Sequence, residues 1–367
     1  MPNMIFHMPV PFKEKPNSAS SIRPLRMLDA FKKLGYEVTV ISGYGKERKK
    51  EIALIKEQIK LGMKIDFVYS ENSTMPTSLT EKNHLPTFPF LDFGFFRFCQ
   101  KNSIKVGVFY RDIYWRFSEY TQTVGLFKSS ISRLFYMYEL LAFRMYTDTL
   151  YLPSKPMAKY LPGFIRKKTS QLSPGCPEIS DVKSEKLAVK ETLNLLYVGG
   201  LGYNYQLHHL FKAVKNLQGV ELTICTHADQ WELNKGTYSE FLSPNINVVH
   251  ANVSELGIYY QKCDLAVLFV NPHEYWEFAV PLKLFEYLAW GKPIIASKGT
   301  FAASFVDVNN VGWTLDYSSE SLKTFLLRIL HQPAEIEEKS KIVKSVALQE
   351  SWTSRARQVI QDFECLE

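Results

Sequence analysis

The sequence contains no cysteine pair, no long apolar run and no cluster of carboxylates. Its five cysteines are scattered without a Cys-x-x-Cys spacing, so neither a disulfide framework nor a zinc site is indicated. No segment reaches the roughly 18 apolar residues of a membrane span, and no basic leader precedes an apolar stretch at the N-terminus. A DxD-like motif is also missing, so we expect no catalytic metal and no cofactor. These absences favour a cytoplasmic protein, and 367 residues favour two domains.

Charge is distributed unevenly along the chain. Residues 1–190 hold 30 Lys and Arg against 17 Asp and Glu, whereas residues 191–367 hold 14 against 20. The first half is therefore expected to face an anionic surface or substrate. No helix-turn-helix, RNP-like or zinc-finger pattern accompanies the basic residues, so we do not expect nucleic acid to be the partner.

Residues 280–297, VPLKLFEYLAWGKPIIAS, place a helix start, an acid and a strand in one segment. Pro281 suits the first helical turn, where its missing N–H costs nothing. The N–H groups of Leu282 and Lys283 would then point outward at the positive end of the helix, which is an anion site. Glu286 lies one turn further on and could accept hydrogen bonds from vicinal hydroxyls such as those of ribose. The pattern predicts a phosphate and ribose site, although a plain packing helix with a solvated Glu286 is the alternative.

A second motif follows the strand predicted at residues 193–198. Gly199, Gly200 and Gly202 come directly after it, and a helix-like stretch follows them. A strand, a glycine turn and a helix bring backbone N–H groups close to a phosphate.

The two motifs together resemble the GT-B glycosyltransferases, in particular the large bacterial family of retaining enzymes that elongate polysaccharides and lipid-linked glycans. The resemblance implies that Glu286 holds the donor ribose, that the backbone at Leu282 and Lys283 holds the diphosphate, and that the turn at Asn252 and Val253 lies against the nucleobase. It gives a set of residues that bind a UDP- or GDP-sugar: Gly199, Gly200, Gly202, Tyr203, Asn252, Val253, Pro281, Leu282, Lys283 and Glu286.

The sequence departs from this family at two points. Retaining members usually place an Arg and a Lys just after the glycines, and this loop offers Tyr203, Asn204, Tyr205 and His208 instead. Lys283 is then expected to stabilise the leaving diphosphate. The family also has a Glu eight residues before the ribose Glu, where this chain has Phe278. Glu277 beside it would take over the contact with the transferred sugar, or is an exposed loop acid.

The resemblance also implies the domain organisation. The first half opens with a strand at residues 4–8, a helix that stops at Gly35 and a strand at residues 37–42, which is a βαβ start. We expect an α/β GT-B fold of two Rossmann-like domains facing across a cleft. The expected parts are an acceptor-binding domain at 1–176, a linker at 177–192, a nucleotide-sugar-binding domain at 193–349, and a last helix at 350–367 that returns to the first domain.

A general base is needed in the first domain if the transfer inverts stereochemistry. Asp112 is the candidate, because it follows a predicted strand at the edge where α/β sites cluster. A salt bridge with Arg111 or Arg116, or a helix cap, is the alternative role of Asp112. His7, at the end of the first strand, is a second candidate, although a packed histidine is the more common outcome.

Two segments of the first half have the composition of a lipid-binding surface. Residues 46–64 combine Ile52, Ile55 and Ile59 at helical spacing with several lysines, which is typical of a basic amphipathic helix. Residues 88–98 are rich in phenylalanine. The alternative is that the isoleucines and phenylalanines belong to the domain's own core.

We therefore expect a glycosyltransferase, of the hexosyltransferase type, that moves a sugar from a UDP- or GDP-linked donor to a lipid-linked glycan in bacterial surface polysaccharide synthesis. Lys283, Asp112 and Glu277 are the candidate catalytic residues. The protein would lie peripherally on the inner face of the cell membrane. The alternatives are a noncatalytic GT-B homologue that acts as a glycan-binding or accessory subunit, and a GT-B-like sugar-nucleotide epimerase, for which no set of catalytic carboxylates is evident.

Overall fold

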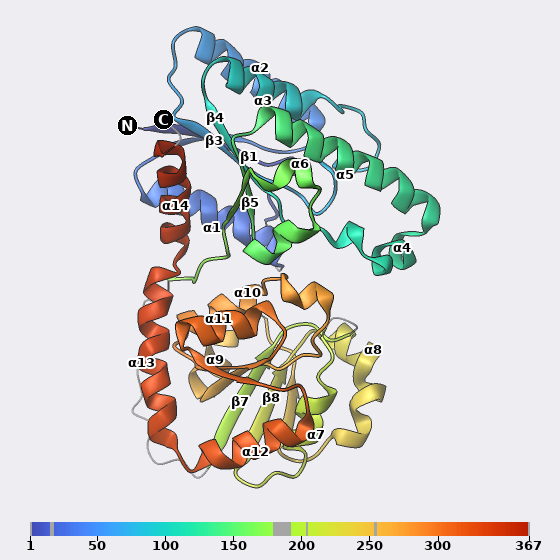
Figure 1. Cartoon of the computed structure of the whole chain (residues 1–367), viewed down its shortest axis with the longest axis vertical. Coiled ribbons are helices and arrows are strands. Elements are labelled where there is room, and N and C mark those ends of the chain that lie inside the picture. The colour runs from blue at the N-terminus through green and yellow to red at the C-terminus, as the bar shows by residue number, and fades with distance from the viewer. Residues whose placement is uncertain (1, 15–17, 179–191, 203–204, 253–254, 366–367) are drawn as a thin grey trace. The chain divides into compact units, whose positions relative to one another are not determined.

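A computed structural model of the chain describes residues 2–14, 18–178, 192–202, 205–252 and 255–365. It divides into two compact units, one formed by Met1–Pro174 with Trp352–Glu367 and the other by Gly175–Ser351. Each unit contains a six-stranded parallel sheet with helices on both faces (Figure 1). This is the α/β architecture expected from the sequence. Most of the linker expected at 177–192 lies outside the described residues.

The first unit has strand order β2-β1-β3-β4-β5-β6. Short apolar strands alternate with helices, and a parallel sheet built in this way is buried on both faces. Its strands are β1 (Asn3–His7), β2 (Glu37–Ile41), β3 (Phe67–Glu71), β4 (Lys105–Phe109), β5 (Thr149–Leu152) and β6 (Thr169–Gln171). Its helices are α1 (Ala19–Lys33), α2 (Gly45–Lys60), α3 (Leu91–Lys101), α4 (Ser118–Val124), α5 (Leu126–Tyr146), α6 (Gly163–Arg166) and α14 (Trp352–Glu364), with single 3₁₀ turns η1 (Thr77–Leu79), η2 (Tyr114–Arg116) and η3 (Lys155–Tyr160).

The last helix of the chain belongs to the core of the first unit. Helix α14 packs beside α1 on one face of the sheet (Figure 1). The ring of Phe363 stacks on that of Phe67 with centroids 5.0 Å apart. Gln358 Nε2 also donates to the carbonyl oxygen of Gln171 at 2.7 Å, so α14 covers strands from β3 to β6.

The second unit has strand order β12-β11-β10-β7-β8-β9. Its strands are β7 (Leu193–Val198), β8 (Val220–Cys225), β9 (Ile246–Val249), β10 (Leu265–Leu268), β11 (Ile294–Ser297) and β12 (Gly312–Leu315). Its helices are α7 (His208–Val214), α8 (Ala228–Tyr238), α9 (Leu256–Lys262), α10 (Leu282–Ala289), α11 (Phe301–Asn309), α12 (Ser319–Leu330) and α13 (Pro333–Gln349), with 3₁₀ turns η4 (Ser239–Phe241) and η5 (Glu274–Glu277).

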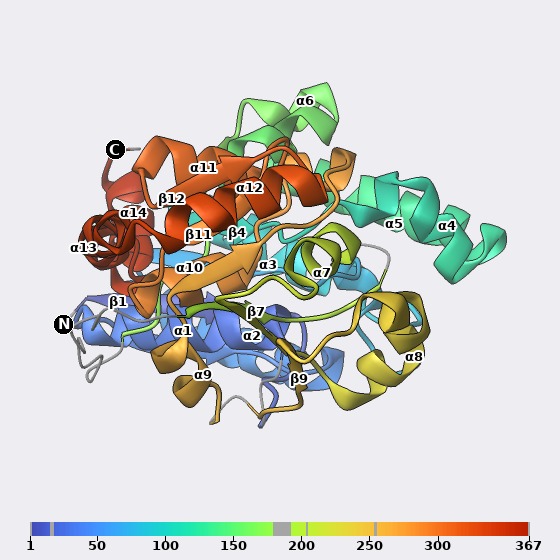
Figure 2. The same ribbon diagram turned by 90° about the horizontal axis from the view of Figure 1, so that it is seen from below.

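Two apolar layers enclose the sheet of the second unit. One joins the sheet to α7 and α12, which lie side by side in Figures 1 and 2. The other joins it to α9, α10, α11 and α13. Helix α10 supplies Leu284, Phe285 and Leu288, all fully buried, to the second layer. This burial fixes the rotation of α10 and therefore the direction in which its polar residues point.

The strand order changes direction between β1 and β3 in the first unit, and between β7 and β10 in the second. At such a switch point the connections leave in opposite directions, and the gap above the carboxyl ends of the strands is where open α/β sheets bind ligands. The topology thus marks one ligand site in each unit.

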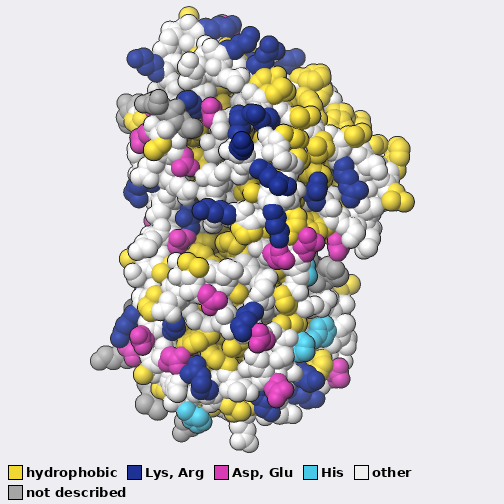
Figure 3. All heavy atoms as spheres, viewed as in Figure 1, with side chains coloured by type: hydrophobic (Ala, Val, Ile, Leu, Met, Phe, Trp, Pro, Cys, Tyr) yellow, Lys and Arg dark blue, Asp and Glu magenta, His cyan; other side chains and the backbone are white. Residues whose placement is uncertain are grey.

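The two segments expected to form a lipid-binding surface are largely core. Ile52 and Ile55 on α2 are buried, as are Phe93, Phe95 and Phe96 on α3. The lipid-binding interpretation is wrong for these five side chains, because they are buried in the core, whereas Phe90 of the second segment is 71% exposed. An apolar face is instead exposed on α5, where Figure 3 shows hydrophobic side chains gathered.

None of the described helices is long and apolar enough to cross a membrane. The described residues also contain no group of three or more His, Cys, Asp or Glu side chains that could hold a metal ion.

Candidate functional site

The glycine turn lies at the switch point of the second unit, directly after β7. Gly199 and Gly202 have φ values of 143° and 127°, which L side chains rarely adopt. Gly199 N donates to Cys225 O at 2.9 Å, and Leu201 N donates to Gln230 Oε1 at 3.1 Å. These bonds hold the turn against β8 and α8 and fix its backbone in place.

Lys283 approaches this turn from α10. A Cβ atom at position 199 would lie 2.3 Å from Lys283 Nζ, so only glycine leaves room for the amine. Lys283 Nζ donates to Tyr197 Oη at 2.9 Å and lies 4.2 Å from the ring centroids of both Tyr197 and Tyr205. Tyr197 Oη in turn donates to Gly200 O at 2.6 Å. The structure therefore brings together the two motifs that lie far apart in the sequence.

The Lys283 side chain is only 8% exposed. Burial lowers the pKa of Lys283 to about 7, although the charge of Glu286 partly opposes the shift. The amine is held by tyrosines rather than by a carboxylate at bonding distance, and a charged ammonium in such a site gains strongly from an anion. The arrangement can bind a phosphate group and stabilise its charge.

Helix α10 begins at Leu282 with Pro281 as the residue before it. Pro281 therefore stands one position earlier than expected, because its ψ of 130° is extended rather than helical. The first N–H groups of a helix have no partner within it, so those of Leu282 and Lys283 are directed at the same switch point.

Glu286 is half-buried one turn into α10. Tyr260 Oη donates to Glu286 Oε2 at 3.3 Å and steadies the carboxylate. Tyr287 Oη accepts from Val198 N at 2.9 Å, which fastens α10 to the end of β7. The Glu286 carboxylate is thus held in place by Tyr260, on a helix fastened to the end of β7, and could accept hydrogen bonds from hydroxyl groups.

The structure describes only some of the other residues predicted to bind the donor in the second unit. Asn252 N donates to Glu255 Oε2 at 2.8 Å, so this N–H is already engaged by the turn before α9. Glu277 is exposed at the end of η5, and Phe278, which stands at the family's Glu position, is buried. Tyr203 and Val253 lie outside the described residues.

The first unit contains a cavity of about 500 Å³ at its own switch point. Segments that follow β1 and β3 line it, together with the start of α1. Its wall carries hydroxyl and amide groups and the cations Lys13, Lys82 and Arg111 against one carboxylate, Glu81. This composition suits a hydroxylated ligand that also carries negative charge.

Arg111 is the most strongly fixed of these cations. Its Nη2 donates to Glu71 Oε2 at 3.3 Å and its Nε to Asn72 O at 3.2 Å. Glu71 is fully buried and also accepts from Arg23 Nε at 2.9 Å. Two guanidinium groups thus share one carboxylate, and Arg111 Nη1 has no partner among the described residues.

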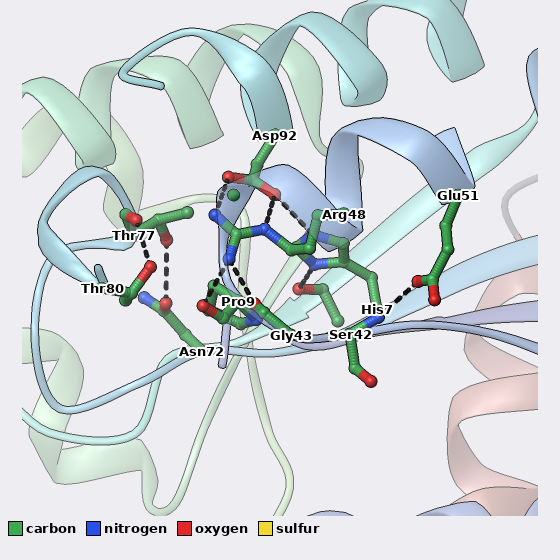
Figure 4. A network of polar contacts seen from close by, with 12 residues as sticks. His7, Pro9, Ser42, Gly43, Arg48, Glu51, Asn72, Thr77, Thr80 and Asp92 are labelled. Carbon is green, nitrogen blue, oxygen red and sulfur yellow. Dashed lines mark hydrogen bonds and ion pairs between the residues drawn. The ribbon is translucent and has the colours of Figure 1, made fainter. Parts of the chain in front are cut away.

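A buried ion network shapes the loops beside the cavity (Figure 4). Arg48 binds Asp92 through Nε at 2.9 Å and Nη2 at 3.0 Å, and its Nη1 donates to the carbonyl oxygens of Pro9 and Gly43. Burial by itself raises the pKa of Asp92, but the hydrogen bond from His7 and the charge of Arg48 outweigh it and lower this pKa. The network ties the loops after β1 and β2 to α2 and α3.

His7 and Asp112 both have structural partners. His7 is buried, with Nε2 2.8 Å from Asp92 Oδ1 and Nδ1 2.8 Å from Ser70 Oγ, which is the packed-histidine alternative. Asp112 Oδ1 accepts from Ile113 N at 2.6 Å and Tyr114 N at 3.0 Å, so Asp112 holds the turn that leads into η2.

The sequence reasoning did not find Tyr197, Tyr260, Asn72 or the buried acid Glu139. Asn72 Nδ2 donates to Glu139 Oε1 at 3.1 Å, and Thr77 N donates to Glu139 Oε2 at 2.7 Å. Burial raises the pKa of Glu139 to about 7 despite these hydrogen bonds. Tyr197 and Glu139 stand in apolar runs, and Tyr260 and Asn72 belong to no motif that the sequence shows.

Residues 179–348 match the model of the family Glycosyl transferases group 1. A comparison with curated protein sequences found no match. Several solved structures resemble the whole chain at low sequence identity. Sucrose-phosphate synthase from Thermosynechococcus elongatus has a TM-score of 0.63 at 15% identity, covering 100% of this chain and 99% of that chain. Anabaena HepE in complex with UDP has a TM-score of 0.65 at 11% identity, covering 100% of both chains. WaaG, a glycosyltransferase involved in lipopolysaccharide biosynthesis, has a TM-score of 0.57 at 15% identity, covering 98% and 99%.

Proposed function

We propose that this chain, a glycosyltransferase of GT-B fold whose residues 179–348 match the group 1 glycosyl transferases, moves a sugar from a UDP- or GDP-linked donor to a lipid-linked glycan. We propose further that it acts at the inner face of a bacterial cell membrane in surface polysaccharide synthesis. The likeness to WaaG supports that setting. UDP is the favoured nucleotide, because the structures of Anabaena HepE hold UDP or UDP-glucose.

One observation supports the donor site above all others, namely the approach of Lys283 Nζ to Gly199. It supports a site formed by the buried amine, the glycine backbone and the first N–H groups of α10. Such donors bind the diphosphate, while Glu286 accepts the ribose hydroxyls.

Lys283 is the proposed catalytic cation. Negative charge accumulates on the diphosphate as the glycosidic bond breaks, and a fixed cation stabilises that state more than the bound donor. Lys283→Ala is expected to lower the turnover rate by about a hundredfold, the usual effect of losing one strong electrostatic donor. The Kd for UDP is expected to change less, so kcat measured beside Kd tests the assignment.

Two further residues have proposed roles at the reacting sugar. Glu277, exposed at the end of η5, would contact the transferred sugar in place of the buried Phe278. Asp112, which follows β4 in the first unit, would act as general base if the transfer inverts stereochemistry.

The acceptor is proposed to bind in the cavity of the first unit. Hydroxyl and amide groups of its wall suit a saccharide, and Lys13, Lys82 and Arg111 suit the phosphates that join a glycan to its lipid.

Calorimetry with UDP tests the donor site. Glu286→Ala is expected to weaken binding by about 1.5 to 3 kcal/mol, the range for hydrogen bonds to a charged group. Glu337→Ala on α13 is the matched control, because that side chain is exposed and forms a surface ion pair with Lys341. Equal affinities of the Glu286→Ala variant and the control would remove the central assignment.

Mass spectrometry tests the reaction itself. The purified chain is incubated with a panel of nucleotide sugars and lipid-linked saccharides, and a mass increase of one sugar is expected. If nucleotide binds but no donor is transferred or hydrolysed, the accessory role is favoured instead.

A further inference from the structure

Helix α5 carries an apolar stripe that the described residues of the first unit leave exposed. Phe127, Ile131, Leu134, Leu141 and Met145 are all exposed, with Phe127 at 79% and Leu134 at 71%. Their spacing of three, four or seven residues places them on one face of the helix. A helix of 21 residues is about 31 Å long, so the stripe extends over most of that length.

Helix α3 continues this surface alongside α5. The ring of Phe90, which is 71% exposed at the start of α3, packs edge-on against Tyr138 of α5 with centroids 6.2 Å apart. At the other end, Gln100 Nε2 donates to Met145 O at 3.1 Å. The two helices therefore present one continuous face, which we name the α3–α5 face.

The charges on the α3–α5 face have one sign. Arg97, Lys101, Lys128 and Arg144 are exposed. The carboxylates of these two fully described helices, Asp92 and Glu139, are buried. Figure 3 shows Lys and Arg side chains beside the hydrophobic ones in this part of the molecule.

We propose that the α3–α5 face binds the surface of an anionic lipid bilayer. The apolar stripe would enter the boundary between headgroups and acyl chains, and the four cations would contact anionic headgroups. A second copy of the chain fits less well, because two such faces would bring like charges together at an apolar contact. The inference rests on the proposed function only in that a lipid-linked acceptor requires the enzyme to work at a membrane.

Sedimentation with lipid vesicles tests the proposal. Wild-type protein is expected to bind vesicles that contain phosphatidylcholine and phosphatidylglycerol. It should bind vesicles of phosphatidylcholine alone more weakly. Phe127→Ser with Leu134→Ser should lower the partition coefficient at least about tenfold, because two large apolar side chains are removed. Lys128→Gln with Arg144→Gln should lower it about fivefold per residue on anionic vesicles only.

The matched control lies on α2, where Leu54 is also exposed beside exposed lysines. Leu54→Ser with Lys49→Gln and Lys50→Gln is expected to leave the partition coefficient within about twofold of wild type, because the apolar face of α2 is buried. Binding that falls in this control but not in the Phe127→Ser, Leu134→Ser variant would overturn the proposal.

Two other outcomes would also overturn it. One is wild-type protein that does not sediment with anionic vesicles. The other is wild-type protein that is dimeric by light scattering and becomes monomeric in the Phe127→Ser, Leu134→Ser variant, because a second copy then covers the face. UDP affinity, measured without lipid, reports the donor site separately, so failure of the membrane proposal and failure of the proposed function are distinguishable.

Discussion

Nucleotide binding at Lys283 is expected to take up a proton above neutral pH. Burial lowers the pKa of this amine in the free protein to about 7. A bound diphosphate favours the charged form and returns the pKa toward its usual range. At about pH 8 roughly one free molecule in ten has a charged Lys283, so binding takes up about 0.9 protons per nucleotide. At about pH 6 the amine is already charged and the uptake falls to nearly zero.

The same shift sets the pH dependence of affinity. Each pH unit above about 7 requires another 1.36 kcal/mol to protonate the amine, so the Kd for UDP should rise about tenfold between pH 8 and pH 9. The terminal phosphate of UDP does not contribute there, because its second ionisation lies near pH 6. Below about pH 7 the contribution of Lys283 to the Kd should no longer change with pH.

Calorimetry in buffers of different ionisation enthalpy measures the proton uptake directly. The apparent binding enthalpy at about pH 8 is plotted against the ionisation enthalpy of the buffer, and the slope gives the number of protons. Lys283→Met, which has a similar shape and no charge, is the control and should bind more weakly with zero slope. A wild-type slope of zero, or an unchanged slope in Lys283→Met, would refute the assignment of a neutral buried amine.

Three further predictions concern residues in or beside the proposed donor and acceptor sites. Gly199→Ala should lower the free energy of unfolding by about 1 to 3 kcal/mol and weaken UDP binding, because the new methyl group displaces the buried amine. Gly202→Ala should affect UDP binding much less, because its Cβ would meet no described atom within 4 Å. Urea unfolding measures the stability of both variants and calorimetry their affinity for UDP. Asp92→Asn should cost about 3 to 5 kcal/mol in urea unfolding, because Arg48 then remains buried without its carboxylate. The difference in free energy of unfolding between wild type and Asp92→Asn should shrink as pH falls through the lowered pKa of Asp92, since the ion pair with Arg48 contributes only while the carboxylate is ionised. Arg111→Gln should raise the KM for a lipid-linked diphosphate acceptor about tenfold without changing UDP affinity. Kinetics with varied acceptor concentration measure this KM, and an unchanged KM would contradict the proposed location of the acceptor site.

The sequence alone predicted the local structure of the proposed donor site. A glycine turn after an apolar strand, and a helix that starts at Pro-Leu-Lys with Glu one turn later, are recognisable because their residues are close in sequence. Alternating strands and helices also indicated two parallel sheets. The short strands β6 and β12 were not predicted, because their few residues carry no distinct pattern.

Tertiary structure decided how far each of these features is exposed and what it contacts. The sequence predicted Lys283 at an anion site, but only folding buries its amine against Tyr197 and Tyr205, beside a glycine about eighty residues earlier. Helical periodicity predicted an apolar face on α2, and the structure buries that face while it leaves the one on α5 exposed. Spacing along a chain fixes which side chains share a face of a helix, but only the packing of distant segments determines what covers that face.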